Sequence, residues 1–238
     1  MPDNQFGQPI GESLDDWPSS LMPSKKPIEG RFCRIAPMSQ DFLNDLYEAY
    51  DLDDGRMWTY MSMGPFESRA DFAHWLKSAS DSMDPMFHVI VDQKSSKAVG
   101  LAAYMRIQPG AGVIEIGSIA FSPLLQKTAL ATEAMFLFMQ RAFDELGYRR
   151  YEWKCDSLNA PSRAAALRLG FSYEGLFRQA LVYKNRSRDT TWFSILDSEW
   201  PRLKVAFLGW LDESNFDEND LQRTRLQAFQ TQYLDGKP

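Results

Sequence analysis

Apolar and polar residues follow regular patterns along most of the chain from residue 30 onward. Alternating or short continuous apolar runs predict strands at 30–37, 87–92, 98–107, 113–121, 149–155, 173–183 and 190–196. Apolar residues at helical spacing predict helices at 39–50, 67–81, 128–147 and 159–169. This order of elements predicts an α/β (α+β) fold with a mixed central sheet of about six to seven strands and helices on both faces.

Polar residues and glycines mark several expected boundaries. Ser39 is expected to cap the first helix, and Gly147 to end the third. A basic loop, residues 184–188, is expected to join the last two strands. These boundaries follow from local residue chemistry alone.

The two ends of the chain differ from the region between them. Residues 1–29 are rich in Pro, Gly, Ser and Asp and predict an extended arm. Its apolar residues are expected to anchor it on the body: Phe6, Ile10, Leu14, Trp17 and Leu21. Residues 201–238 predict a helical C-terminal extension packed on the central domain (30–200), with a dimer contact as the alternative. The apolar residues from Glu199 onward include Trp200, Leu203, Phe207, Leu208 and Trp210.

Composition excludes several classes of protein. The 238 residues are 44% hydrophobic and 24% charged, with a net charge of -6, so a basic nucleic-acid-binding face is not expected. No run approaches the roughly 20 apolar residues that span a bilayer, and the N-terminus lacks a secretory signal pattern, so we expect a cytoplasmic protein without a membrane partner. Cys33 and Cys155 have no metal-ligand spacing, so buried packing and no metal are expected.

The segment from residue 113 to residue 134 carries the clearest chemical signal. An apolar strand stops at Pro123, and the turn from Gln126 to Ala131 leads into a helix. The first amides of a helix lack intrahelical partners and carry partial positive charge, which suits a phosphate. Lys127 adds charge, and the hydroxyl of Thr128 or Thr132 is expected to cap the helix or to contact phosphate.

This turn resembles the acyl-CoA-binding loop of the GNAT acetyltransferases, Gln/Arg-x-x-Gly-x-Gly/Ala. Here it reads Gln126-Lys127-Thr128-Ala129-Leu130-Ala131, with Ala129 where the family usually has glycine. Three further segments resemble the ribosomal-protein acetyltransferase (RimJ/RimL-type) branch of that family. They are Glu115-Ile116-Gly117, Asn159-x-x-Ser162 followed by Leu169-Gly170-Phe171, and Glu174-Gly175-x-x-Arg178.

The resemblance covers residues 30–200 and implies a role for each matching residue. Glu115 would be the general base, with a solvated surface carboxylate as the alternative. Ser162 would protonate the leaving thiolate. The cofactor-binding residues would be Ile119 and Phe121 for pantetheine, Gln126, Lys127, Thr128, Ala129, Leu130, Ala131 and Thr132 for the diphosphate, and Asn159 and Ser162 near the thioester. Asn159 also has a purely structural explanation, as a helix N-cap.

The implied activity is transfer of an acetyl group from acetyl-CoA to a primary amine by direct attack. The acceptor would be a protein N-terminus, a polyamine or an aminoglycoside-like amine, and the protein a monomer or homodimer. Two alternatives stay open: a non-catalytic acyl-CoA-binding sensor, and transfer of a longer acyl chain. Arg163 or Arg168 would meet the 3′-phosphate or remain solvated, and Tyr60 or Trp58 would line the acceptor pocket or belong to the core.

Overall fold

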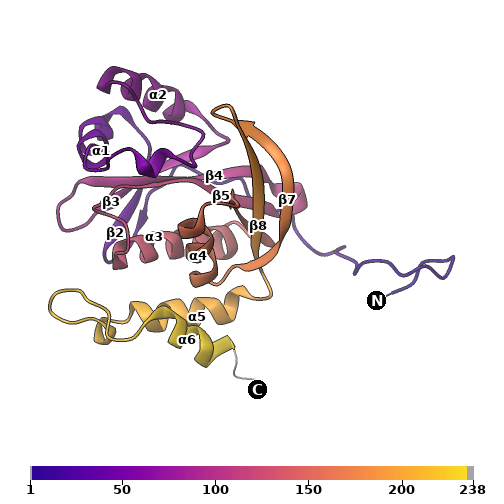
Figure 1. Ribbon diagram of the computed structural model, residues 1–238. Helices are drawn as coiled ribbons and strands as arrows, with labels where there is room; N and C mark the ends of the chain where they lie inside the picture. Colours follow the sequence, from indigo (N-terminus) through magenta and orange to yellow (C-terminus); the bar gives the residue numbers. More distant parts are fainter. Residues whose placement is uncertain (1, 235–238) are drawn as a thin grey trace.

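An eight-stranded mixed sheet forms the centre of the computed structural model, which describes residues 2–234 (Figure 1). Residue 1 of the predicted arm and residues 235–238 of the predicted extension lie outside the described range. The strands lie in the order β1-β2-β3-β4-β5-β6-β8-β7. Their bounds are β1 (Ile28–Glu29), β2 (Cys33–Pro37), β3 (Met86–Asp92), β4 (Ala98–Gln108), β5 (Val113–Phe121), β6 (Arg150–Asp156), β7 (Ser172–Tyr183) and β8 (Arg186–Leu196).

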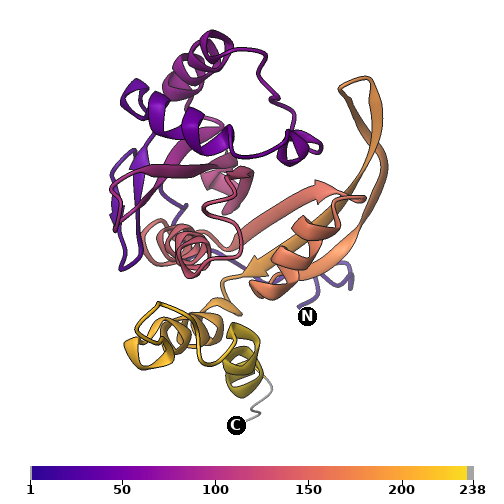
Figure 2. The same ribbon diagram turned by 60° about the vertical axis from the view of Figure 1, so that its left-hand side comes forward.

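Helices cover both faces of this sheet, which confirms the predicted architecture (Figures 1 and 2). The helices are α1 (Leu43–Tyr50), α2 (Arg69–Asp81), α3 (Ala129–Gln140), α4 (Ala160–Arg168), α5 (Trp200–Leu211) and α6 (Leu226–Leu234). On one face α1 and α2 bury Leu46, Phe72 and Leu76. On the other face α3 and α5 bury Phe138 and Phe207. The short strand β1 is the one strand that the sequence pattern did not predict.

Strands β5 and β6 are paired along only part of their length. Their parallel pairing runs from Val113 with Arg150 to Ile116 with Trp153, although both strands continue beyond these positions. Past that point β5 carries a bulge, because the register with β4 shifts and Ser118 adopts a φ of 49°. The two strands therefore separate at their C-terminal ends and leave an open edge on β5.

Two predicted boundaries were wrong in detail, and a third was confirmed. The last hairpin turns through Lys184 and Asn185 alone, with φ angles of 48° and 58°, and residues 186–188 belong to β8. Two successive left-handed residues form the tight turn that matches strand twist, which a count of basic residues does not predict. The predicted end of the third helix is confirmed, because the helix continues past Gln140 as a π-helical turn to Glu145 and Gly147 follows with the left-handed φ (71°) of a helix end. The Ser39 hydroxyl donates to Asp41 (3.1 Å) instead of capping the helix.

The predicted packing of the arm was wrong for most of its anchor residues. Phe6, Ile10, Leu14 and Leu21 are all exposed, Phe6 to 76%, and the N-terminal part of the arm extends away from the body (Figure 1). The later part of the arm does lie on the body, where the amides of Ser20 and Leu21 donate to backbone carbonyls. Of the five, Trp17 is the one that is half-buried, with the Arg149 guanidinium 5.7 Å from its ring centroid. Apolar residues in a segment do not by themselves show that the segment packs, because packing also needs a complementary surface elsewhere in the protein.

The C-terminal extension packs on α3. Trp200 of α5 stacks on Phe143 (ring centroids 5.1 Å apart), and Phe207 stacks on Phe136 (5.3 Å). Leu203 and Trp210 are also buried, whereas Leu208 is exposed. Among residues 2–234, none of the helices has the length and apolar content needed to cross a membrane.

Candidate active site

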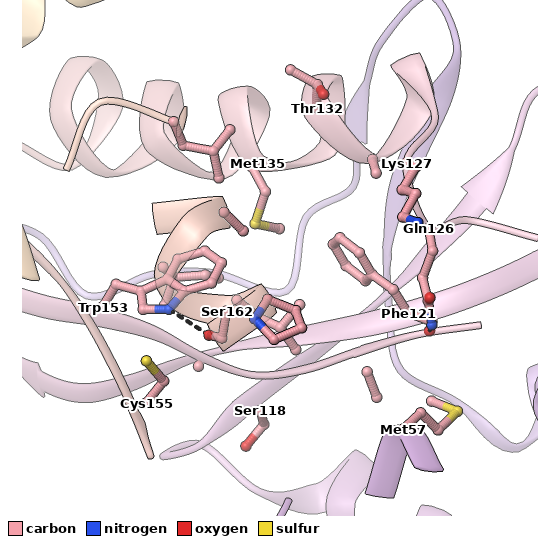
Figure 3. A pocket seen from close by; sticks show the side chains of 18 of the residues that line it. Met57, Ser118, Phe121, Gln126, Lys127, Thr132, Met135, Trp153, Cys155 and Ser162 are labelled. Carbon is pink, nitrogen blue, oxygen red and sulfur yellow. Dashed lines mark hydrogen bonds between the residues drawn. The ribbon is translucent and has the colours of Figure 1, made fainter. Parts of the chain in front are cut away.

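A cleft of about 2220 Å³ opens where β5 and β6 separate, between the N-terminal ends of α3 and α4 (Figure 3). It is lined by β5, β6, β8, α3, α4 and the segment between α1 and α2. The residues expected to act in catalysis or to contact the cofactor all line it: Glu115, Ile119, Phe121, Gln126, Lys127, Thr128, Ala129, Leu130, Ala131, Thr132, Asn159 and Ser162. Residues from distant parts of the sequence thus meet in one site.

The turn before α3 presents free backbone amides to the cleft. Among residues 2–234, the amides of Lys127, Thr128, Ala129 and Leu130 donate to no protein acceptor. The positive φ of Lys127 (62°) turns the chain into the helix. Amides at a helix N-terminus bind anions, because the helix dipole adds to their own partial charge. The turn therefore fits a diphosphate group without any rearrangement of its hydrogen bonds.

Three residues of this turn, Gln126, Ala131 and Thr132, differ from the sequence-based expectation, whereas the expected Thr128 cap is confirmed. The amide of Gln126 donates to the Ser122 carbonyl (3.0 Å), and the amide of Ala131 donates to Thr128 Oγ1 (3.1 Å), so neither amide is free. By accepting from the Ala131 amide, the Thr128 hydroxyl acts as the helix cap, and it also donates to the Leu125 carbonyl (2.7 Å). The Thr132 hydroxyl is taken as well, because it accepts from Arg168 (2.9 Å).

Ala129 occupies ordinary helical backbone at the start of α3, and Lys127 is the residue that takes the left-handed conformation. An alanine at position 129 therefore introduces no backbone strain. The family's glycine is not required here for conformation.

The open edge of β5 fits an amide-bearing chain. Between the pairs Leu101–Ala120 and Ala103–Gly117, the single β4 residue Ala102 faces two β5 residues, Ser118 and Ile119. The backbone groups at this bulge therefore lie outside the regular ladder. The carbonyl of Phe121, in contrast, already accepts from Gln126 Nε2 (2.8 Å), so the Gln126 side chain fixes the strand end.

Ser162 lies in the first turn of α4, across the cleft from α3 (Figure 3), and Asn159 directly precedes this helix. Asn159 Oδ1 accepts from the amide of Ser162 (3.1 Å), which confirms its role as the helix N-cap. The indole N–H of Trp153 donates to Ser162 Oγ (3.0 Å). Because this bond uses an oxygen lone pair, the hydroxyl proton of Ser162 stays available for donation into the cleft.

Glu115 is a buried carboxylate bound to a buried lysine. Lys154 Nζ lies 2.7 Å from Glu115 Oε2, and the two side chains are 8% and 7% exposed. Arg106 Nε lies 3.6 Å from the same oxygen. Burial raises the pKa of Glu115, while the charge and hydrogen bond of Lys154 oppose the rise. Glu115 is therefore not the solvated surface carboxylate that the sequence left open.

This pair belongs to a longer chain of charges along β6. Lys154 Nζ also lies 2.6 Å from Glu152 Oε2, and Glu152 Oε1 lies 2.7 Å from Arg150 Nε. Arg150 then forms a two-pronged ion pair with Glu174 of β7, at 2.7 and 2.5 Å. Arg150 therefore holds Glu174 in position. The chain of alternating charges connects the cleft with the outer hairpin.

The β7–β8 hairpin closes the far side of the cleft. Its tip contacts the segment between α1 and α2, where Lys184 Nζ donates to the Trp58 carbonyl (2.7 Å) and Arg186 donates to the Thr59 carbonyl (2.7 Å) (Figure 2). Tyr60 lines the cleft there, whereas Trp58 is buried against Tyr50, with ring centroids 5.2 Å apart. Of the two aromatic candidates, Tyr60 is the one that faces the site.

Several residues of the cleft escaped the sequence analysis: Lys154, Trp153, Trp192, Arg106 and Arg188. One signal pointed to the first of them. Arg150, Glu152 and Lys154 recur at every second position in an otherwise apolar strand, so their charged side chains share one face. Their partners come from β5, β7 and β8. The sequence of β6 does not specify how these strands are aligned with it, so the partners could not be predicted.

Other candidates have simpler roles. Cys33 is buried away from the cleft; Cys155 is also buried but lines it, and its thiol lies 3.1 Å from Thr191 Oγ1. Of the two arginines considered for a 3′-phosphate, Arg168 lines the cleft. His88 is buried and His74 exposed. Within residues 2–234, no three His, Cys, Asp or Glu side chains gather as metal ligands would.

Comparison with known proteins agrees with this geometry. A family model described as an acetyltransferase (GNAT) domain matches residues 34–172. The crystal structure of a GCN5-related N-acetyltransferase from Brucella melitensis superposes with a TM-score of 0.89 at 48% identity, covering 91% of this chain and 99% of that one. The "Uncharacterized N-acetyltransferase YnaD" of Bacillus subtilis (strain 168) is 26% identical over 147 residues, which is 62% of this chain and 84% of that protein.

The fold and the cleft define an acyl-group transferase. The chain belongs to the GNAT family of acetyltransferases, as the family match and the Brucella relative show.

Proposed function

We propose that this protein is an N-acetyltransferase that moves the acetyl group of acetyl-CoA to a primary amine by direct attack. The observation that carries the proposal is the pairing of free amides at residues 127–130 with the open edge of β5 beside them. The amides suit a diphosphate and the open edge suits the amide groups of pantetheine, which would direct the thioester toward Ser162 and Glu115.

Glu115 is the proposed general base. An amine must lose its proton before it attacks a carbonyl carbon, and a carboxylate with a raised pKa accepts a proton more readily near neutral pH. Lys154 keeps that carboxylate ionised although it is buried. Glu115 would take the proton directly or through a water molecule.

Ser162 is the proposed acid. Its hydroxyl oxygen is held by the Trp153 indole, so its proton is free to pass to the departing thiolate. Attack without an acyl-enzyme fits the environment of Cys155. The thiol of Cys155 lies beside a threonine hydroxyl, which is not a general base at neutral pH.

The RimJ/RimL-type branch is proposed on residues alone. Residues of two matching segments, Glu115-Ile116-Gly117 and Asn159-x-x-Ser162, line the cleft. Gly175 of the third segment lies at a bulge of β7, a position that the flexible backbone of glycine suits. A protein N-terminus would then be the acceptor class, with small amines as the alternatives.

The proposal is tested by mixing the purified protein with acetyl-CoA and a panel of amines while free thiol is measured. Calorimetry with coenzyme A provides a separate reading of cofactor binding. We expect binding together with amine-dependent thiol release. Binding without turnover on any amine would favour the sensor alternative, and no binding at millimolar coenzyme A would refute both.

A further inference from the structure

A cluster of cationic residues borders the acceptor side of the cleft, although the chain as a whole has a net charge of -6. Three cationic residues lie at or beside the tip of the β7–β8 hairpin: Lys184, Arg186 and Arg188. Lys184 and Arg186 donate to backbone carbonyls, and Arg188 Nε donates to the Thr190 hydroxyl (3.1 Å). Within residues 2–234, none of the three has a carboxylate within 4 Å, so their charges are not neutralised.

The carboxylates on this side of the cleft are already engaged. Asp156 is buried and accepts from the Tyr183 hydroxyl (2.8 Å) and the Leu158 amide (2.9 Å). Asp53 accepts from the Gly55 amide (2.8 Å) and the Met57 amide (3.0 Å). Glu115 is paired with Lys154. Asp156 and Asp53 accept only from neutral donors and keep their charges, so the case against a polycationic acceptor rests on the repulsion from the three cations of the hairpin tip, unpaired within residues 2–234.

Hydrogen-bond donors follow β8 from Arg188 toward the proposed base, Glu115. Alternation along β8 puts Arg188, Thr190 and Trp192 on one face, and all three line the cleft. The indole nitrogen of Trp192 is buried without a hydrogen-bond partner among the described residues, so one donor on this wall is unused. Lys154 Nζ lies 3.8 Å from the centroid of the Trp192 ring and connects this wall to Glu115.

We propose that the acceptor amine also carries an anionic group, a carboxylate or a phosphate, and that Arg188 binds it. This inference rests on the proposed function and selects among its acceptors, against polyamines and aminoglycoside-like amines. Arg188 and Trp192 are four residues apart, or roughly 13 Å along a strand. An extended peptide covers that length in about four residues, so an acidic side chain near the fourth position of a free N-terminus would reach Arg188.

Two peptides with free N-termini test the proposal, identical except for Glu or Gln at the fourth position. A phosphoserine version separates phosphate from carboxylate recognition, and spermidine represents the polycations. We expect the KM for the Glu peptide to be about 10-fold lower than for the Gln peptide, as for one hydrogen bond to a charged group. In Arg188→Gln that difference should vanish with kcat nearly unchanged, and Arg188→Lys should restore part of it.

Arg178→Gln is the matched control, because Arg178 lies on the same hairpin, exposed and outside the cleft. Melting curves check that each variant folds. Calorimetry with the N-acetylated peptides and coenzyme A measures the same preference without turnover. Equal KM and equal binding for the Glu and Gln peptides, or a preference for spermidine, would overturn the inference. Failure of the proposed function is distinct, because it would appear as absent cofactor binding or absent thiol release with every amine.

Discussion

The Lys154 ammonium lies 2.7 Å from Glu115 Oε2, and both side chains are less than a tenth exposed. A carboxylate in such a place is pushed toward its neutral form by burial and held in its charged form by the lysine. Glu152 lies on the other side of the same ammonium, at 2.6 Å, and its charge raises the pKa of Glu115 further. Lys154 is therefore the residue that sets the protonation state of the proposed base.

Replacing this lysine should move the acid limb of the pH–rate profile. In Lys154→Met, Glu115 faces Glu152 without the intervening cation, so the pKa of Glu115 should rise. A base acts only above its pKa, so the acid limb of kcat/KM should shift to higher pH, with a larger loss of activity at pH 6 than at pH 8. Lys204→Met is the control, because Lys204 pairs with Asp144 outside the cleft. An acid limb that does not move would contradict this role.

Substitution of Glu115 should separate chemistry from binding. Glu115→Gln keeps the shape of the side chain but removes its capacity to accept a proton. We expect kcat to fall by about 10²–10⁴-fold, the usual contribution of general base catalysis. The Kd for coenzyme A should change less than twofold, since the proposed cofactor contacts come from β5, α3 and α4. Calorimetry and thiol release measure the two quantities, and full turnover in this variant would exclude Glu115 as the base.

Much of the fold and part of the site could be predicted from the sequence, because those features depend on local chemistry. Nearby residues alone specify three such features: the strand at 113–121, its end before Pro123 and the Thr128 cap. The partner of Glu115 could not be predicted in this way. Lys154 reaches Glu115 only through the parallel register of β5 with β6, which neither strand specifies alone. The place of Arg188 in the cleft could not be predicted either, since residues 186–188 of the predicted basic loop are in fact part of β8.

Ser162 and its indole partner allow a paired test of the proposed acid. Ser162→Ala removes the hydroxyl proton and leaves the Trp153 N–H without its acceptor. We expect a loss of about 10²-fold or more in kcat, the lower end for general acid catalysis. Trp153→Phe keeps the Ser162 hydroxyl and loses only its donor, so a smaller decrease is expected. Equal decreases in both variants would indicate that packing, rather than proton donation, matters at this position.

The amides before α3 can be tested one at a time with proline. Ala129→Pro removes a single free N–H, and proline is tolerated at the first position of a helix. The preceding residue, Thr128, has φ -99° and ψ 164°, an extended conformation that a following proline accepts. We expect the Kd for coenzyme A to rise about 10-fold, as for one lost hydrogen bond to a charged group.

Two controls accompany that variant. Ala129→Gly keeps the N–H and should bind coenzyme A almost as the original chain does. S-acetylpantetheine lacks the diphosphate, so its affinity should be the same for Ala129→Pro and for the unchanged protein. A proline variant with unchanged affinity for coenzyme A would show that this amide does not contact phosphate.

The outer end of the charge chain should control stability in acid. The Arg150 guanidinium and the Ser194 hydroxyl hold the pKa of Glu174 down, to about 2. A carboxylate whose pKa is lowered on folding stabilises the protein above its unfolded pKa and loses that effect as the pH falls toward the folded value. Because Glu174 is partly exposed, Glu174→Gln should lower Tm by only about 1–3 °C at pH 7. The difference in Tm should shrink as the pH falls from 5 toward 2. Glu67→Gln is the control, because Glu67 is an exposed carboxylate outside the cleft, and its effect on Tm should not depend on pH in this way. If the Tm difference between Glu174→Gln and the unchanged protein persists at low pH, the ion pair is excluded as its cause.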